Sequence, residues 1–139
     1  IVSTGESATV EETGSYLFQQ EILGEPASKS NSRRIVKIKG NTRIIKSEKA
    51  LRYKDDFLRQ IKPPPVPIEG DVMIEVVVWY ATRRPDLDIT LIMDLLQDSK
   101  VILNDRQIKV IKAYHQLDKN NSRSIIRLSR VSSDLTLPF

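Results

Sequence analysis

The sequence lacks cysteine altogether, which excludes disulfide bonds, thiolate zinc sites and a cysteine nucleophile. It has one histidine, and no pair of histidines at the spacing that binds a metal ion. A glycine-rich phosphate-binding loop and a nucleophile elbow are also missing. No apolar run approaches the ~20 residues of a membrane helix, so we expect no membrane partner. The first residues lack the basic start and apolar centre of a secretory signal, which is compatible with a cytoplasmic protein.

What is present suits one globular domain. The chain has 139 residues, of which 40% are hydrophobic and 29% charged, which is enough for one modest core. Residues 1–15 are small, polar and acidic, so we expect a flexible acidic N-terminal tail. Residues 16–139 are then the folded domain, and no internal repeat divides them.

Hydrophobic periodicity and turn residues predict two helices among several strands. The strands are expected at 16–23, in a hairpin over 34–47 with its turn at Gly40-Asn41, and at 71–80, 106–115 and 122–131. One helix is expected over 48–61 with Ser47 as its N-cap, and another over 88–98 with Asp88 as a possible N-cap. This order predicts an α+β fold, a single domain in which two helices pack on a mixed β-sheet.

Positive charge is concentrated in one part of the chain. Residues 29–54 contain ten lysines and arginines against a single acid, Glu48, while the net charge of the whole chain is +4. Such a concentration favours a polyanionic partner, because each cation that meets a phosphate releases a condensed counterion. A solvated surface or a flexible arm is the alternative. The candidate DNA-binding residues of this segment are Arg33, Arg34, Lys37, Lys39, Arg43 and Lys46.

Two aspartates follow the most hydrophobic strand-like run of the sequence. Asp86 and Asp88 are one residue apart, and side chains at i and i+2 of an extended chain point to the same side. Asp105 follows an apolar helix and a short strand, which could return it to the mouth of the same cleft. Three carboxylates would form an all-oxygen site that selects Mg²⁺ or Mn²⁺ over zinc. Alternatively, the aspartates cap a helix and lie in solvated turns.

Several motifs in order resemble the RusA family of Holliday-junction resolvases. They are RRPDLD at 83–88, the helix with Asp94-Leu95-Leu96, Asn104-Asp105-Arg106-Gln107-Ile108, the loop Pro26-Ala27-Ser28 with Asn31, and the helix start from Ser47 to Tyr53-Lys54. In the family the corresponding patterns are an arginine run with D-L-D-N, a helix with an internal Asp-x-Leu, D-D-x-Q-Val/Ile, Pro-Pro-Ser-Asn and Ser-x5-Tyr-Arg. The resemblance covers residues 17–131.

The resemblance assigns roles to five residues. It implies that Asp86, Asp88 and Asp105 are the catalytic residues that bind Mg²⁺, with Mn²⁺ as a possible substitute. Arg83 and Arg84 match the arginine run of the family and would lie near the DNA phosphates. No further cofactor is implied.

The resemblance also implies an activity and an assembly. Residues 16–139 would be a RusA-like nuclease domain that acts as a homodimer on four-way or branched DNA. It would resolve Holliday junctions by Mg²⁺-dependent phosphodiester hydrolysis in DNA recombination and repair. We would then expect a protein of bacterial or phage origin in the cytoplasm, associated with the nucleoid.

Three positions depart from the family pattern. Ile89 replaces the asparagine after D-L-D, Ile92 replaces the catalytic lysine, and Asn104 replaces the first acid of the D-D pair. Loss of the lysine removes a positive charge from the transition state, which costs several kcal/mol of barrier. The alternative function is therefore that of a non-catalytic DNA-binding relative with the same fold. Basic residues that could replace the missing charge are Lys46, Lys100 and Arg106.

Three other side chains need an interpretation. His115 lies in an alternating strand and is expected on the strand surface rather than as a general base. Trp79, at the end of the central strand, is expected in the core. Tyr53 lies on the basic helix, where a DNA contact and a structural role are equally open.

Overall fold

The computed structural model describes residues 16–28 and 33–131, with the backbone alone for most of residues 33–46. The predicted acidic tail, residues 1–15, lies outside the described residues. The elements are β1 (Tyr16–Leu23), β2 (Arg33–Ile38), β3 (Asn41–Lys46), α1 (Glu48–Gln60), β4 (Val72–Tyr80), α2 (Thr90–Asp98), the short 3₁₀ helix η3 (Asp105–Gln107), β5 (Ile108–Leu117) and β6 (Arg123–Arg130). Their order confirms the predicted α+β fold.

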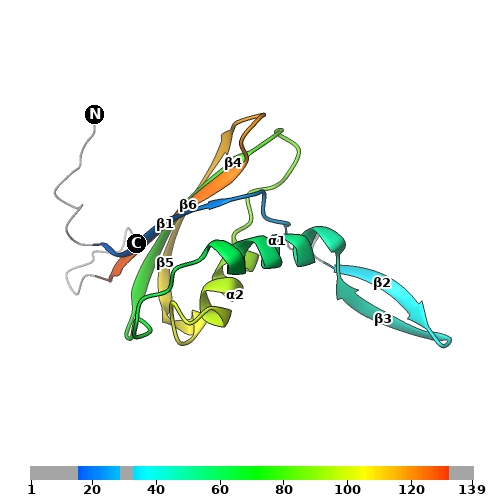
Figure 1. Ribbon diagram of the computed structural model, residues 1–139, viewed down its shortest axis with the longest axis horizontal. Coiled ribbons are helices and arrows are strands. Elements are labelled where there is room, and N and C mark those ends of the chain that lie inside the picture. The colour runs from blue at the N-terminus through cyan, green and yellow to red at the C-terminus, as the bar shows by residue number, and fades with distance from the viewer. Residues whose placement is uncertain (1–15, 29–32, 132–139) are drawn as a thin grey trace, which may run out of the picture.

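A mixed four-stranded sheet forms the body of the molecule, with strand order β1-β6-β4-β5. β4 runs parallel to β5 and antiparallel to β6, and β6 is antiparallel to β1. Helix α2 connects the parallel pair, and α1 and α2 lie on the same side of the sheet (Figure 1). Both helices pack on it through buried residues such as Phe57 and Leu95, which are 0% exposed. None of the described helices is long and apolar enough to span a membrane.

The central strand β4 has two unlike faces, although its run VVVW suggests that both are covered. Its residues alternate between buried and half-exposed along the whole strand. Val76 and Val78 are buried towards the helices, whereas Trp79 lies half-exposed on the opposite face. The guanidinium of Arg123 covers the Trp79 ring at 4.1 Å from its centroid. The expectation of a core tryptophan is therefore wrong, because no described helix covers that face.

Helix α1 begins at the predicted cap. Ser47 Oγ accepts a hydrogen bond from the amide of Ala50 at 3.2 Å, which pairs one of the free N–H groups of the first turn. Tyr53 faces the core with 2% of its surface exposed, so the DNA contact considered for it is excluded. Helical periodicity predicts that Leu51 and Leu58 belong to one apolar stripe with Ala50 and Phe57, but they are 45% and 40% exposed. The helix therefore buries a narrower stripe than expected.

Strands β2 and β3 form a separate antiparallel hairpin that extends away from the sheet (Figure 1). Its two turn residues are Lys39 and Gly40, at φ 52° and 81°. A two-residue turn with both residues in the left-handed region matches the twist of a hairpin. The turn thus lies one residue before the predicted Gly40-Asn41, since Asn41 already pairs with Ile38.

Candidate functional site

Asp86 and Asp88 lie after β4, as the sequence predicted, on an irregular segment formed by residues 81–88, which is called the turn below. This turn has no regular secondary structure and is held by the side chain of Tyr80, the last residue of the strand. The Tyr80 hydroxyl donates to the carbonyl of Asp86 at 3.2 Å, and the amide of Asp88 donates to the same hydroxyl at 3.5 Å. One buried phenol therefore ties down both aspartate-bearing positions.

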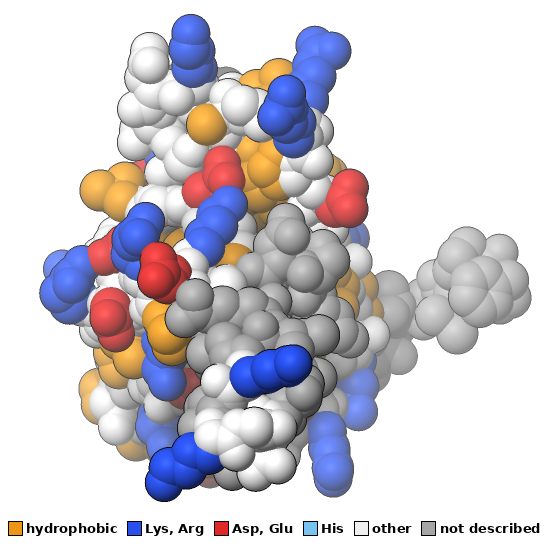
Figure 2. Space-filling model, turned by 90° about the vertical axis from the view of Figure 1, so that its right-hand side faces the viewer, with side chains coloured by type: hydrophobic (Ala, Val, Ile, Leu, Met, Phe, Trp, Pro, Cys, Tyr) orange, Lys and Arg blue, Asp and Glu red, His pale blue; other side chains and the backbone are white. Residues whose placement is uncertain are grey.

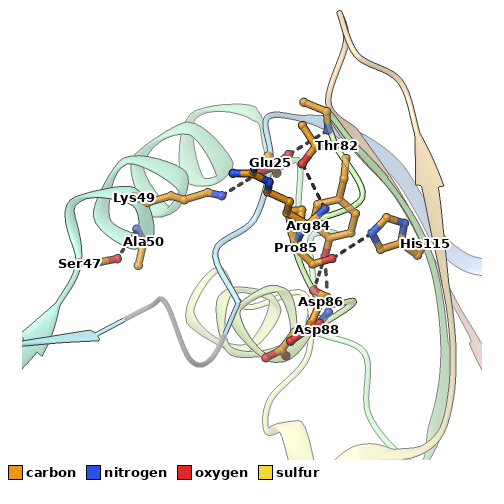
Figure 3. A network of polar contacts seen from close by, with 12 residues as sticks. Glu25, Ser47, Lys49, Ala50, Thr82, Arg84, Pro85, Asp86, Asp88 and His115 are labelled. Carbon is orange, nitrogen blue, oxygen red and sulfur yellow. Dashed lines mark hydrogen bonds and ion pairs between the residues drawn. The ribbon is translucent and has the colours of Figure 1, made fainter.

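His115 of β5 holds the same turn from the neighbouring strand. Its ring stacks on that of Tyr80 with centroids 4.4 Å apart, and Nε2 lies 3.0 Å from the carbonyl oxygen of Pro85. Because a carbonyl only accepts, Nε2 carries the hydrogen and donates it. His115 is half-buried rather than a plain strand-surface residue, and Figure 3 shows it directed at Pro85.

Glu25, from the loop after β1, binds the start of the turn. One carboxylate oxygen accepts from the amide of Ala81 at 3.0 Å, and the other pairs with Lys49 Nζ at 2.7 Å (Figure 3). Burial acts to raise the pKa of Glu25, but the hydrogen bonds from Lys49 and Ala81 and the positive charge of Lys49 outweigh it. The pKa therefore lies below its ordinary value. Sequence analysis missed this residue because its partner amide is 56 positions away.

The outer side of the turn lines an open pocket of about 600 Å³. Its lining residues are Arg83, Pro85, Asp86, Leu87, His115, Gln116 and Leu117. Asp86 is exposed there, and so is Arg83. A carboxylate and a guanidinium on one open pocket can meet a cation and a phosphate, respectively.

The two aspartates differ in what their carboxylates do. Asp88 Oδ1 accepts a hydrogen bond from the amide of Thr90 at 2.9 Å, at the start of α2. The predicted N-cap is therefore wrong by one residue, because Ile89 is the N-cap, but the Asp88 carboxylate still pairs the first amide of the helix. Burial raises the pKa of Tyr80, and the negative charges of Glu25, Asp88 and Asp86 raise it further. The hydrogen bond from the Asp88 amide lowers it, but by less, so the pKa of Tyr80 lies above its ordinary value.

Asp105 lies at the start of η3, after α2. Its amide donates to Gln97 Oε1 at 2.8 Å, and its side chain is exposed. Among residues 16–28 and 33–131, no three His, Asp or Glu side chains gather closely enough to hold a metal ion. The structure therefore does not bring Asp86, Asp88 and Asp105 together as such a group.

The donors that are present still fit a magnesium ion. Mg²⁺ in phosphoryl-transfer sites keeps several waters and is held by one or two carboxylates together with substrate phosphates. Asp86 and Asp88 supply two hard oxygen donors on one turn, of which Asp86 lines the open pocket and Asp88 also accepts from the Thr90 amide.

No family model matches this chain, and no curated protein sequence matches it. The resemblance to the RusA resolvases therefore rests on the motifs quoted above. At the positions of its missing asparagine and lysine, Ile89 and Ile92 are 6% and 0% exposed and belong to the core. These two positions do not face the pocket.

The residues expected to bind DNA lie in two places. Lys37 and Lys39 are exposed on the hairpin, and Arg83 and Arg84 are exposed on the turn before Asp86. The expected contacts whose side chains lie outside the described residues are Arg33, Arg34, Arg43 and Lys46. Figure 2 views the molecule from the side to which the hairpin extends, and lysines and arginines project there among scattered acids.

Proposed function

We propose that the protein is a Mg²⁺-dependent, structure-specific endodeoxyribonuclease that resolves Holliday junctions and other branched DNA in recombination and repair. The observation that carries the proposal is the turn after β4. It presents Asp86 and Asp88 next to two exposed arginines at the end of the central strand of an α+β domain. The exposed lysines of the hairpin support a DNA substrate.

In this proposal the aspartates of the turn bind the metal ion and its arginines bind phosphate. Asp86 and Asp88 would hold the Mg²⁺ ion, which when bound there supplies an activated water and stabilises charge on the leaving oxygen. Arg83 and Arg84 bind the flanking phosphates, for which planar guanidinium groups are well suited. The proposal keeps Asp105, at the start of η3, as the third catalytic aspartate, although the structure does not group it with the other two.

The proposal includes a two-fold homodimer, because two opposing strands of a four-way junction are cut and the junction is itself two-fold symmetric. Light scattering should then give about twice the chain mass of 15.9 kDa. The corresponding location is the cytoplasm, in association with the nucleoid, and the corresponding origin is bacterial or phage.

Cleavage of a labelled four-way junction, with and without Mg²⁺, tests the proposal. The wild-type protein should cut only with the metal, and Asp86→Asn should abolish cutting while junction binding persists, since that change removes charge but little volume. Asp71→Asn is the matched control, because Asp71 is an exposed aspartate at the opposite end of β4. Equal cutting by Asp86→Asn and by wild type would refute the role of Asp86.

Two observations favour a second candidate, a non-catalytic DNA-binding relative. The Asp88 carboxylate already accepts a hydrogen bond from the Thr90 amide of α2, and Ile92 is buried where the family has its lysine. This candidate is the better one if the wild-type protein binds junctions but cuts none, with neither Mg²⁺ nor Mn²⁺ raising its melting temperature. A bound ion at a hundredfold excess over its dissociation constant would stabilise the fold by about 2.7 kcal/mol.

A further inference from the structure

The aspartate-bearing turn owes its position to individual contacts. Residues 81–88 form neither helix nor strand, and most of their side chains are exposed. A segment of this kind is free to move unless its backbone groups are bonded to rigid elements. The position of each carboxylate therefore depends on the residues that hold the backbone of the turn.

Tyr80 supplies the first of these contacts from inside the core. Its side chain is 1% exposed, and its hydroxyl reaches two backbone groups that are two residues apart, the carbonyl of Asp86 and the amide of Asp88. A phenol hydroxyl has one hydrogen to donate and lone pairs to accept, so both bonds form at once. The two bonds fix the relative orientation of the two positions.

His115 supplies the second contact and also steadies the first. Its Nε2 donates to the carbonyl of Pro85, the residue just before Asp86, and its ring lies on the Tyr80 ring. Strands β4 and β5 are parallel neighbours, with Val78 beside His115 in the register. Side chains from two adjacent strands therefore hydrogen-bond to the backbone of the turn.

The backbone at Tyr80 is itself held by hydrogen bonds. The carbonyl of Tyr80 accepts a hydrogen bond from the amide of Asp118 at 2.9 Å. The next amide, that of Ala81, donates to Glu25. The phenol therefore projects from a backbone position that is bonded on both sides.

We infer that Tyr80 and His115 are positioning residues, which hold the backbone of residues 85–88 and with it the two aspartates to which the proposed function assigns the cation. The inference rests on the proposed function and names the residues on which its metal affinity depends. Like charges on one turn repel each other, and a backbone free to move would let them separate. Pre-organised ligands avoid that loss, because ligand geometry has to be held within about 0.5 Å to be effective.

Binding of Mn²⁺ to the full chain, followed by electron paramagnetic resonance, measures the effect. Tyr80→Phe keeps the ring and removes both bonds, and His115→Phe keeps the stacking and removes the donor. Each should weaken Mn²⁺ binding about fivefold to tenfold, the factor expected for one to two lost hydrogen bonds. His115→Gln, which retains an N–H donor, should recover part of the loss. Tyr114→Phe is the matched control, since Tyr114 is 44% exposed on the other face of β5 and should bind Mn²⁺ as wild type does.

Hydrogen exchange of the Asp88 amide in metal-free protein gives an independent readout. Exchange should be faster in Tyr80→Phe than in wild type and unchanged in Tyr114→Phe. All measurements are made well below the melting temperature of each variant, so that a loss of global stability does not contribute. If exchange is unchanged, or if it rises while Mn²⁺ affinity stays at the wild-type value, the positioning role is refuted.

The same experiment separates failure of the inference from failure of the proposed function. A wild-type protein that binds no Mn²⁺ refutes the metal-dependent function and with it the role given to Tyr80 and His115. A wild-type protein that binds Mn²⁺ with an affinity insensitive to both substitutions refutes only the positioning role.

Discussion

Replacing Glu25 by glutamine should destabilise the protein by about 1 kcal/mol at neutral pH. The substitution breaks the 2.7 Å ion pair with Lys49, whose side chain is 45% exposed against 20% for Glu25. A pair this accessible contributes no more than about 1 kcal/mol. Glutamine Oε1 can still accept from the amide of Ala81, so that bond weakens without being lost. The melting temperature should fall by about 3 °C for a chain of this size.

The effect should depend on pH in a definite direction. Because the pKa of Glu25 lies below its ordinary value of 4.5, the folded state binds this proton less readily than the unfolded state does. The stabilisation from Glu25 is therefore complete above pH 4.5 and disappears as the pH falls through the lower folded value. Urea denaturation of wild type and Glu25→Gln across this range should give curves that converge in acid.

Two further variants decide whether the reasoning is correct. Glu25→Ala also removes the acceptor of the Ala81 amide and should cost about 1 to 2 kcal/mol more than Glu25→Gln. Glu69→Gln, the same change at an exposed loop position, should leave stability unchanged. If Glu25→Gln and Glu25→Ala are equally destabilising, or if the loss persists unchanged in acid, the contacts assigned to Glu25 are incorrect.

Three other substitutions test separate parts of the structure. Lys100→Gly should stabilise the protein by about 1 kcal/mol in urea denaturation, because Lys100 ends α2 in the left-handed region at φ 68°; a loss of stability would contradict this. Tyr53→Phe should change stability by less than about 0.5 kcal/mol, since the buried Tyr53 hydroxyl lies near Ser124 Oγ but without the geometry of a hydrogen bond to it; a large loss would show that the two hydroxyls are bonded. Joint replacement of Lys37 and Lys39 by alanine should reduce the salt dependence of junction binding by about two units of the logarithmic slope, and an unchanged slope would mean that the hairpin does not touch phosphate.

Much of the fold could be predicted because its signals are local. Ser47 as a helix cap and the length of β1 follow from residues within a few positions of each other. The prediction of the hairpin turn was wrong by one residue, because the turn is decided by the pairing of two strands and not by a local signal. Turns at Lys39-Gly40 and at Gly40-Asn41 are both compatible with the sequence, and strand pairing selects the one that puts a lysine at φ 52°.

The candidate site was predictable only in part. Asp86 and Asp88 could be placed because a buried strand ends just before them. His115 could not, because its approach to Pro85 depends on β5 lying next to β4, which the α2 crossover decides. Sequence also gave no sign that Asp105 and the other two aspartates would fail to gather, since that depends on how α2 and η3 pack.

Among the described strands, β1 pairs only with β6, which joins it to the rest of the sheet. A ribosome delivers residues 16–23 long before residues 123–130, so β1 does not have its partner edge until β6 emerges. Closing a loop of roughly a hundred residues costs entropy and slows folding, so we expect the sheet to form only after β6 has been synthesised. A message cut short before residue 123 would leave β1 and one edge of β4 without partners, and such edges are starting points for aggregation. Strand β6 therefore completes the sheet that carries the turn with Asp86 and Asp88.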